Sequence, residues 1–213
     1  MTNRHFLLTS AAAAACTAMA WGAEPAPPAP LNVQVEGGVV RFDSGTNFSA
    51  VSVHGKAAGL RAAVQARRAD GTLLLEDIQA SLPVKALSTG MGLRDEHMRK
   101  YIFTTAGGTL PDLKFTAGNL KCPVQPARES PCQIAGELSI RGVAKPFTMT
   151  LKVRQDAASP AVFKAAGEAT VKLSDYGIER PSQLGVQTQD EVKLAIEFTG
   201  KETVSSARAG GAQ

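Results

Sequence analysis

Residues 133–154, QIAGELSIRGVAKPFTMTLKVR, decide the fold of this chain. Apolar or small residues occupy every second position from Ile134 to Ile140, and the same alternation resumes from Phe147 to Val153. A period of two with one apolar face is typical of half-buried antiparallel strands. Because only the short segment 142–145 joins the two runs, this stretch predicts a tight β-hairpin.

The same alternation appears twice more toward the C-terminus, in residues 165–173 and 192–199. Earlier segments are less regular, but β-branched and aromatic residues predict strands at 39–42 and 48–53. A further strand is expected at 113–121. Together these segments indicate an all-β chain.

Residues 62–84 are compatible with two structures. The segment AAVQARR at 62–68 could form a helix by propensity alone. The turn sequence Ala-Asp-Gly-Thr at 69–72, followed by the run at 73–84, favours a hairpin instead.

One segment, STGMGLRDEHMRKYIF at 88–103, departs from the β pattern and predicts a short helix. At helical spacing its apolar face would hold Leu93, His97, Met98, Tyr101 and Ile102. We therefore expect about eight antiparallel strands with one short helix across an opening. All-β chains of this size close into barrels or sandwiches.

The N-terminal segment predicts an exported protein. In residues 1–22, Arg4 and His5 precede an apolar, alanine-rich run from Phe6 to Ala20, which is typical of a cleaved secretory signal peptide. Cleavage after Ala20 or Gly22 would leave small residues at the required positions. The run is shorter than the ~20 residues of a membrane span. Acylation of Cys16 as a lipoprotein is the less favoured alternative, since Ala13 stands where leucine is usual.

Between the ends we expect one domain. The composition predicts a Pro/Ala linker at residues 23–30 (AEPAPPAP) and a disordered tail at residues 203–213. Residues 31–202 are long enough to bury one core, and no composition break divides them. A homodimer is compatible with the sequence, which does not give the oligomeric state.

After removal of the leader, the cysteines are Cys122 and Cys132, flanked by prolines. An exported pair of cysteines favours a structural disulfide, here one that closes a surface loop. The alternative is a metal or redox pair. However, no histidine is near in sequence, and the spacing is not Cys-x-x-Cys.

Charge and motifs argue against nucleic-acid binding and catalysis. The formal net charge is +4, and the basic residues are scattered rather than interleaved with aromatics. The chain holds no Gly-x-Ser-x-Gly, no His-x-x-x-His pair and no glycine-rich phosphate loop. Asp95 and His97 lie two residues apart, so they would not face each other on a helix. We interpret residues 94–99 as a helix cap and ion-pair network, and predict no enzyme activity, metal or cofactor.

Several short motifs follow one another along the chain: Thr89-Gly90, Arg94-Asp95, His97-Met98-Arg99, Pro111 with Phe115, the segment from Gly136 to Pro146, Asp175-Tyr176-Gly177-Ile178 and Asp190-Glu191. In their order and spacing, over about residues 39–200, the chain resembles the YceI-like polyisoprenoid-binding family. Two features depart from that family. Ser88 replaces its usual aspartate before Thr-Gly, and the segment around Cys122 and Cys132 looks like an insertion.

The resemblance implies a lipocalin-like antiparallel barrel in the periplasm whose lumen holds a long amphiphilic lipid of polyisoprenoid, quinone or fatty-acyl type. The alternative is an envelope stress or interaction protein that uses the barrel as a scaffold without a bound lipid. Inward positions inferred from alternation, together with the helix, give the candidate ligand-binding residues Leu93, Met98, Ile102, Phe115, Leu138, Phe147, Met149, Ala165, Gly167, Val171, Tyr176 and Phe198. Small residues among them could leave room for a ligand or pack tightly against their neighbours.

Overall fold

The computed structural model describes residues 30–203. The predicted signal peptide, Cys16, nearly all of the predicted linker and the predicted tail beyond residue 203 lie outside the described residues. Pro30, the last residue of that linker, is the first residue of a strand.

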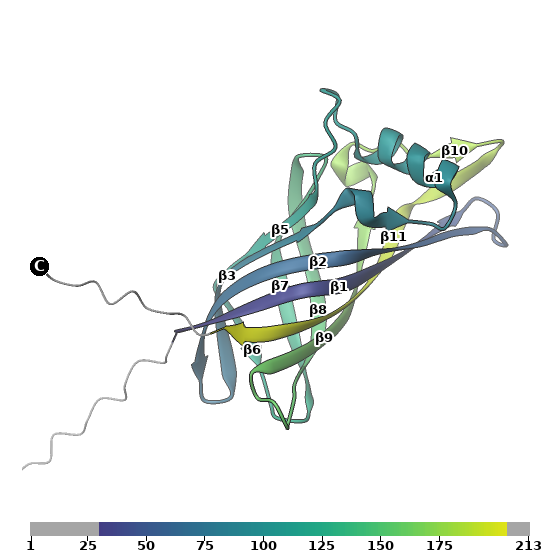
Figure 1. Ribbon diagram of the computed structural model, residues 1–213. Coiled ribbons are helices and arrows are strands. Elements are labelled where there is room, and N and C mark those ends of the chain that lie inside the picture. Colours follow the sequence, from purple (N-terminus) through teal and green to yellow (C-terminus); the bar gives the residue numbers. More distant parts are fainter. Residues whose placement is uncertain (1–29, 204–213) are drawn as a thin grey trace, which may run out of the picture.

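The described chain forms a closed antiparallel barrel of eight strands (Figure 1). In spatial order the wall runs β2, β1, β11, β9, β8, β7, β5, β3, and a further pairing of β2 with β3 closes it. The eight wall strands are β1 (Pro30–Thr46), β2 (Ser52–Ala69), β3 (Thr72–Leu82), β5 (Leu113–Ala117), β7 (Glu129–Ile140), β8 (Val143–Gln155), β9 (Val162–Lys172) and β11 (Val186–Thr203). A further short strand, β6 (Leu120–Pro123), follows β5 and also pairs with β3.

Shorter elements lie at one end of this barrel. They are η1 (Val84–Ala86), β4 (Leu87–Ser88), α1 (Gly92–His97), the π-helical turn η2 (Met98–Phe103), η3 (Ser174–Tyr176) and β10 (Ser182–Gln183). We call α1 and η2 together, residues 92–103, the lid. In Figure 1 the lid crosses the upper end of the barrel.

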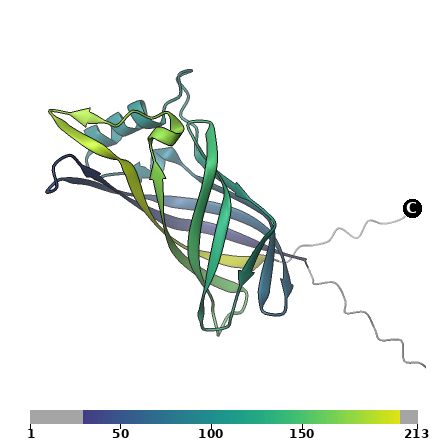
Figure 2. The same ribbon diagram turned by 180° about the vertical axis from the view of Figure 1, so that it is seen from behind.

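The connections between strands divide between two ends of the barrel (Figure 2). At the lid end, the strands are joined by residues 47–51, 83–112, 141–142 and 173–185. At the far end, they are joined by 70–71, 124–128 and 156–161, and the described chain also begins and ends there. The predicted hairpins at 62–84 and 133–154 are both confirmed, as β2–β3 and β7–β8.

The predicted alternation is confirmed along the wall. On β9, for example, Phe163, Ala165 and Val171 are buried, whereas Lys164 and Lys172 are exposed. Inward side chains form two apolar clusters, a large one through most of the barrel and a smaller one beneath the lid. The smaller cluster contains Val40, Ala57, Leu82, Val84, Leu87, Met98 and Ile196.

Two strand predictions were wrong in their limits. Residues 48–51 form a turn rather than a strand, because the Thr46 hydroxyl engages the carbonyls of Phe48 and Val51 and closes the β1–β2 connection. The strand expected at 113–121 is broken at Gly118-Asn119 into β5 and β6. A side chain at Gly118 would lie 2.6 Å from the Glu76 carbonyl oxygen, so this position requires glycine.

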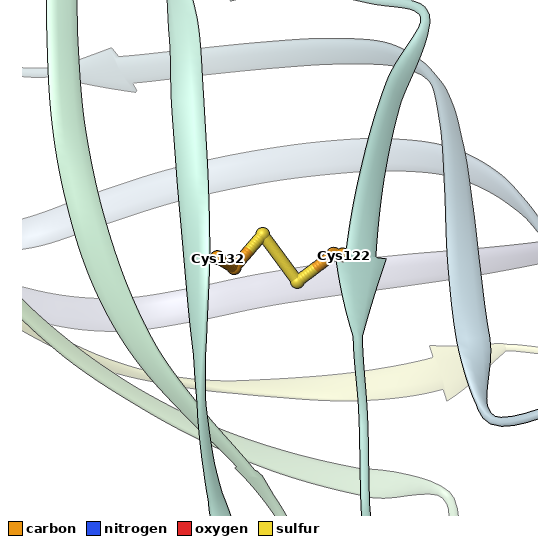
Figure 3. The surroundings of a disulfide bond; sticks show 2 residues. All are labelled: Cys122 and Cys132. Atoms are coloured by element: carbon orange, nitrogen blue, oxygen red, sulfur yellow. A yellow bond between two sulfur atoms is a disulfide. The ribbon is translucent and has the colours of Figure 1, made fainter.

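The predicted disulfide between Cys122 and Cys132 is present, and it closes the β6–β7 connection, whose residues 125–128 are exposed. It joins β6 to β7 inside the wall (Figure 3). Both cysteines are buried in the large cluster, with Cα atoms 4.9 Å apart. Within the described chain, backbone pairing of β7 on this side is confined to β5, at residues 137–139. The disulfide therefore joins β7 to β6 at a level of the wall where β7 has no backbone pairing on this side.

Candidate functional site

The candidate site is the interior of the barrel beneath the lid. Its inner face is apolar, yet several inward side chains on neighbouring strands stay only half-buried. These are Leu138 on β7, Met149 on β8, Ala169 on β9 and Leu194 on β11. A side chain that points into a barrel and still contacts solvent leaves unfilled space beside it, which is a property expected of a binding lumen.

Five half-buried residues pack against both apolar clusters and so lie between the barrel core and the lid. We call Ile102, Phe103, Leu113, Met149 and Phe198 the bridging set. Three of them, Ile102, Met149 and Phe198, belong to the residues predicted from the sequence. Phe103 and Leu113 were missed. Their signal was present, because Phe103 ends the predicted helix and Leu113 alternates with Phe115.

The other predicted residues fall into three groups. Met98, Phe115, Phe147, Ala165, Val171 and Tyr176 are buried. Leu138 and Gly167 are half-buried on the inner face. Leu93 is 64% exposed, so it does not share the buried face of the lid with Met98, as the helical spacing predicted.

Glycines on the barrel wall lie in close contact with neighbouring side chains. A Cβ added at Gly136 would lie 2.9 Å from the Phe115 ring, and one added at Gly55 would lie 2.1 Å from the ring of Phe42. Each glycine therefore lets a neighbouring ring lie along the wall. At Gly167 the neighbour is the Leu151 side chain, 2.7 Å away. The sequence left two alternatives open for the small inward residues, and at Gly136 and Gly167 the contacts favour tight packing against neighbouring side chains.

The lid presents a different face to the barrel from the one predicted. Its helix runs with α-helical geometry only to His97 and then widens into the π-helical turn η2. This change of period turns Tyr101 outward, where it is 62% exposed, while Met98 is buried and Ile102 is half-buried. The ring of Tyr101 instead meets His97 edge-on, with centroids 5.6 Å apart.

Asp95 fastens the lid to the barrel rim. Its buried carboxylate accepts hydrogen bonds from the Ser88 hydroxyl at 2.8 Å, the Thr89 backbone N–H at 2.7 Å and the Thr89 hydroxyl at 2.5 Å. Arg94 adds bonds from Nε to Thr89 Oγ1 and from Nη2 to the Thr89 carbonyl. The serine that departs from the family pattern thus supplies a donor that Asp95 uses.

The electrostatics of this contact follow from burial and its donors. Burial raises the pKa of Asp95, but the hydrogen bonds from Thr89 and Ser88, with the charge of Arg99, hold that pKa below its ordinary value. Among the described residues no ion pair includes a lid residue, so the predicted ion-pair network is instead a set of hydrogen bonds.

A second carboxylate fixes the neighbouring turn at the same end. Asp190 accepts hydrogen bonds from the backbone N–H and the hydroxyl of Ser174, at 2.8 and 2.6 Å. These two bonds lower the pKa of Asp190. The turn they hold buries Tyr176, whose pKa is raised by burial and by the charge of Asp175.

Two open hollows mark the outer surface. One, of about 520 Å³, lies beside the lid and is lined by Lys85, Glu96, Arg99, Lys100, Thr104 and Leu110. The other, of about 640 Å³, spans β2, β1, β11 and β9 and is lined from both faces of the wall, by the outward Arg41, His54 and Lys193 and by the inward Ala169 and Leu194. The first is relevant to the site because Leu110 packs against the apolar cluster under the lid.

The described residues contain no group of three or more His, Cys, Asp or Glu side chains placed to hold a metal ion. His97 contacts Tyr101, and the carboxylate of Asp95 is occupied by Ser88 and Thr89 rather than by His97. Nor does any helix within residues 30–203 have the length and apolar character needed to cross a membrane.

Comparison with curated proteins gives relatives of modest identity. The chain is 29% identical over 128 residues to a UPF0312 protein of Pseudomonas paraeruginosa, covering 59% of this chain and 62% of that protein. It is 28% identical over 141 residues to Protein YceI of Salmonella newport, covering 62% of this chain and 69% of that protein. The chain thus spans less than two thirds of the length of the Pseudomonas relative.

Solved structures share the fold at low identity. A polyisoprenoid binding domain from Saccharophagus degradans superposes with a TM-score of 0.59 at 16% identity, over 81% of this chain and 99% of that one. BcnA of Burkholderia cenocepacia gives a TM-score of 0.56 at 17% identity, over 75% and 95%. The model of the YceI-like domain matches residues 32–200, which is nearly the whole barrel. This chain therefore belongs to the YceI-like domain family.

Proposed function

We propose that this protein binds one long-chain amphiphilic lipid in the barrel lumen and carries it in the bacterial periplasm without catalysing a reaction. The lipid would be of polyisoprenoid, quinone or fatty-acyl type. Its chain would contact the bridging set and the inward residues Leu138 and Ala169, and its polar head would lie at the lid end.

The observation that carries this proposal is the set of inward apolar side chains that remain half-buried, Leu138, Met149, Ala169 and Leu194 among them. Each methylene group moved out of water contributes ~0.8 kcal/mol. About ten buried methylenes therefore offset the cost of immobilising the ligand, and no catalytic group is needed.

The proposed compartment rests on two features. The predicted signal peptide, residues 1–22, begins the chain. The Cys122–Cys132 disulfide is of the kind that persists in oxidising compartments such as the periplasm. The polyisoprenoid-binding domain of Saccharophagus degradans, which shares this fold, is consistent with a lipid chain as the ligand.

The test is to purify the protein from its native envelope, extract it with organic solvent and identify the extract by mass spectrometry. We expect one isoprenoid, quinone or acyl chain per protein molecule. A barrel that is empty in every preparation, and that takes up none of these lipids when they are added, would contradict the proposal. It would favour an interaction protein that uses the barrel as a scaffold.

A further inference from the structure

The exposed apolar side chains of this protein are gathered at one end. Seven large hydrophobic residues are exposed in the described chain, and all seven lie on or next to lid-end connections: Phe48, Val51, Met91, Leu93, Tyr101, Val143 and Leu184. Scattered exposed hydrophobics are ordinary on protein surfaces, but a distribution confined to one end marks an interaction site.

These side chains are held on separate tips rather than on one flat patch. Phe48 and Leu184 occupy the β1–β2 and β10–β11 tips, where they are 51% and 98% exposed. The two tips are tied together, because Asn47 donates through Nδ2 to the Gly185 carbonyl and accepts at Oδ1 from the Gln187 N–H. Figures 1 and 2 show both tips projecting at the same end as the lid.

Cations accompany the apolar tips. The hollow of about 520 Å³ beside the lid is lined by Lys85, Arg99 and Lys100 against a single acid, Glu96. Within residues 30–203, none of these three cations has a carboxylate within ion-pair distance. Leu110 provides an apolar wall to the same hollow. Positive charge next to an apolar surface suits a phosphate head group with its acyl chain.

We propose that the lid end docks on an anionic phospholipid bilayer, with the exposed tips inserted among the lipid head groups and the cationic hollow against lipid phosphates. A protein partner would offer a surface of complementary shape, whereas a fluid bilayer offers none. Isolated apolar tips on different loops can insert into a bilayer without such a surface, so they favour the bilayer. The described chain begins at Pro30 and ends at Thr203, both at the far end and away from this surface. Docking in this orientation places the lid over the lipid from which a carried chain would be taken.

The apolar contribution is tested by co-sedimentation with vesicles of phosphatidylethanolamine and phosphatidylglycerol. Phe48→Ser, Leu93→Ser and Leu184→Ser are combined in one variant, and Ala157→Ser with Ala158→Ser on the exposed far-end loop is the control. We expect the triple variant to lower the vesicle partition coefficient by ~10-fold or more. The control should bind like the wild type. All three proteins keep the same ends, so any contribution from those segments cancels.

The charge contribution uses a second pair of variants. Lys85→Gln with Lys100→Gln should weaken binding to the phosphatidylglycerol vesicles by ~10-fold, and have little effect on vesicles of phosphatidylcholine alone. Lys121→Gln with Lys152→Gln on the outer wall is the matched control. Unchanged thermal midpoints verify that each variant is folded.

If the triple variant binds the vesicles as strongly as the wild type, the docking proposal is overturned. Dissociation of a dimer by that variant with vesicle binding intact would also overturn it, because the lid end would then be a contact between copies. Lipid extraction from the same preparations separates the two proposals. A lipid-loaded protein that binds no vesicles refutes docking alone, whereas an empty barrel that binds them refutes the carrier alone.

Discussion

At the scale of single residues, Asp95 connects the lid to the rest of the molecule. Its carboxylate is buried and receives three hydrogen bonds from Ser88, which ends β4 and pairs with Lys56 of β2, and from the adjoining Thr89. Removing one partner of a buried hydrogen-bonded charge leaves the others unpaired, and this costs more than the bonds contribute.

Asp95→Ala should therefore lower the free energy of unfolding by ~3 kcal/mol, because Ser88 and the Thr89 amide lose their acceptor. Glu96→Ala is the neighbouring control, since Glu96 is exposed. Urea unfolding of both variants measures the difference. An Asp95→Ala protein as stable as the Glu96→Ala protein would show that the lid is held by apolar packing instead.

The same contact makes a prediction about pH. The folded pKa of Asp95 is depressed by its hydrogen bonds, so its stabilisation is fully present above the unfolded value of about 3.9. It is lost as the pH falls through the lower folded pKa. The stability difference between wild type and Asp95→Asn should shrink from pH 7 to about pH 3 in urea unfolding. A difference that grows on acidification would contradict this assignment.

Gly136 illustrates a second residue-level constraint. A methyl group there would lie 2.2 Å from the Thr116 carbonyl oxygen and 2.6 Å from Ala117 Cβ, where backbone cannot easily move. Gly136→Ala should destabilise the barrel by ~1–3 kcal/mol. At Gly107 the nearest atom, Thr105 Oγ1, is 3.9 Å away. We expect Gly107→Ala to stay within ~0.5 kcal/mol of the wild type. Equal thermal shifts in the two variants would refute the steric reason.

At the scale of elements, alternation predicted the strands that form both sides of the hairpin at 133–154, because inward and outward positions on a half-buried strand differ in polarity. It could not limit the strand at 48–53, where the Thr46 side chain closes a turn in spite of the β-propensity of Phe48 and Val51. The break at Gly118 depends on the nearby Glu76 carbonyl, a contact distant in sequence.

In the lid, the sequence pattern predicted the wrong buried face. A helical period of 3.6 placed Leu93 and Tyr101 on the buried face, but the π-helical turn from Met98 changes that period and exposes Tyr101. No residue type in the sequence signals such a turn. The candidate site was therefore predicted better on the strands, where Phe115 and Met149 point inward, than on the lid.

The disulfide is an element-scale brace between β6 and β7. Replacing Cys122 and Cys132 by alanine should lower the free energy of unfolding by ~3 kcal/mol, the value for closing a loop of about this length. Hydrogen exchange should rise along β6 and the first half of β7 before it rises on β9. Uniform loosening of the whole barrel, or an unchanged denaturation midpoint, would argue against a local brace.

At the scale of the whole molecule, the barrel separates a packed far end from a lid end. The far end is held by the disulfide, by Gln155, which donates to the Pro160 carbonyl, and by Arg68 over the Phe163 ring. The lid end carries the half-buried bridging set and all seven exposed large hydrophobics of the described chain. This polarity gives a lipid one preferred direction of entry under both proposals.

The central claim is that a lipid chain occupies the lumen, and the most direct measurement is the binding of a fluorescent long-chain acyl probe to two variants of β9. Ala169 points inward and is half-buried, whereas Ala166 on the same strand points outward and is exposed. The wild type and Ala166→Phe should bind one probe per protein, and Ala169→Phe, which fills the lumen, should weaken binding by ~10-fold or more. Equal affinity of all three proteins for the probe would contradict a lipid-binding lumen.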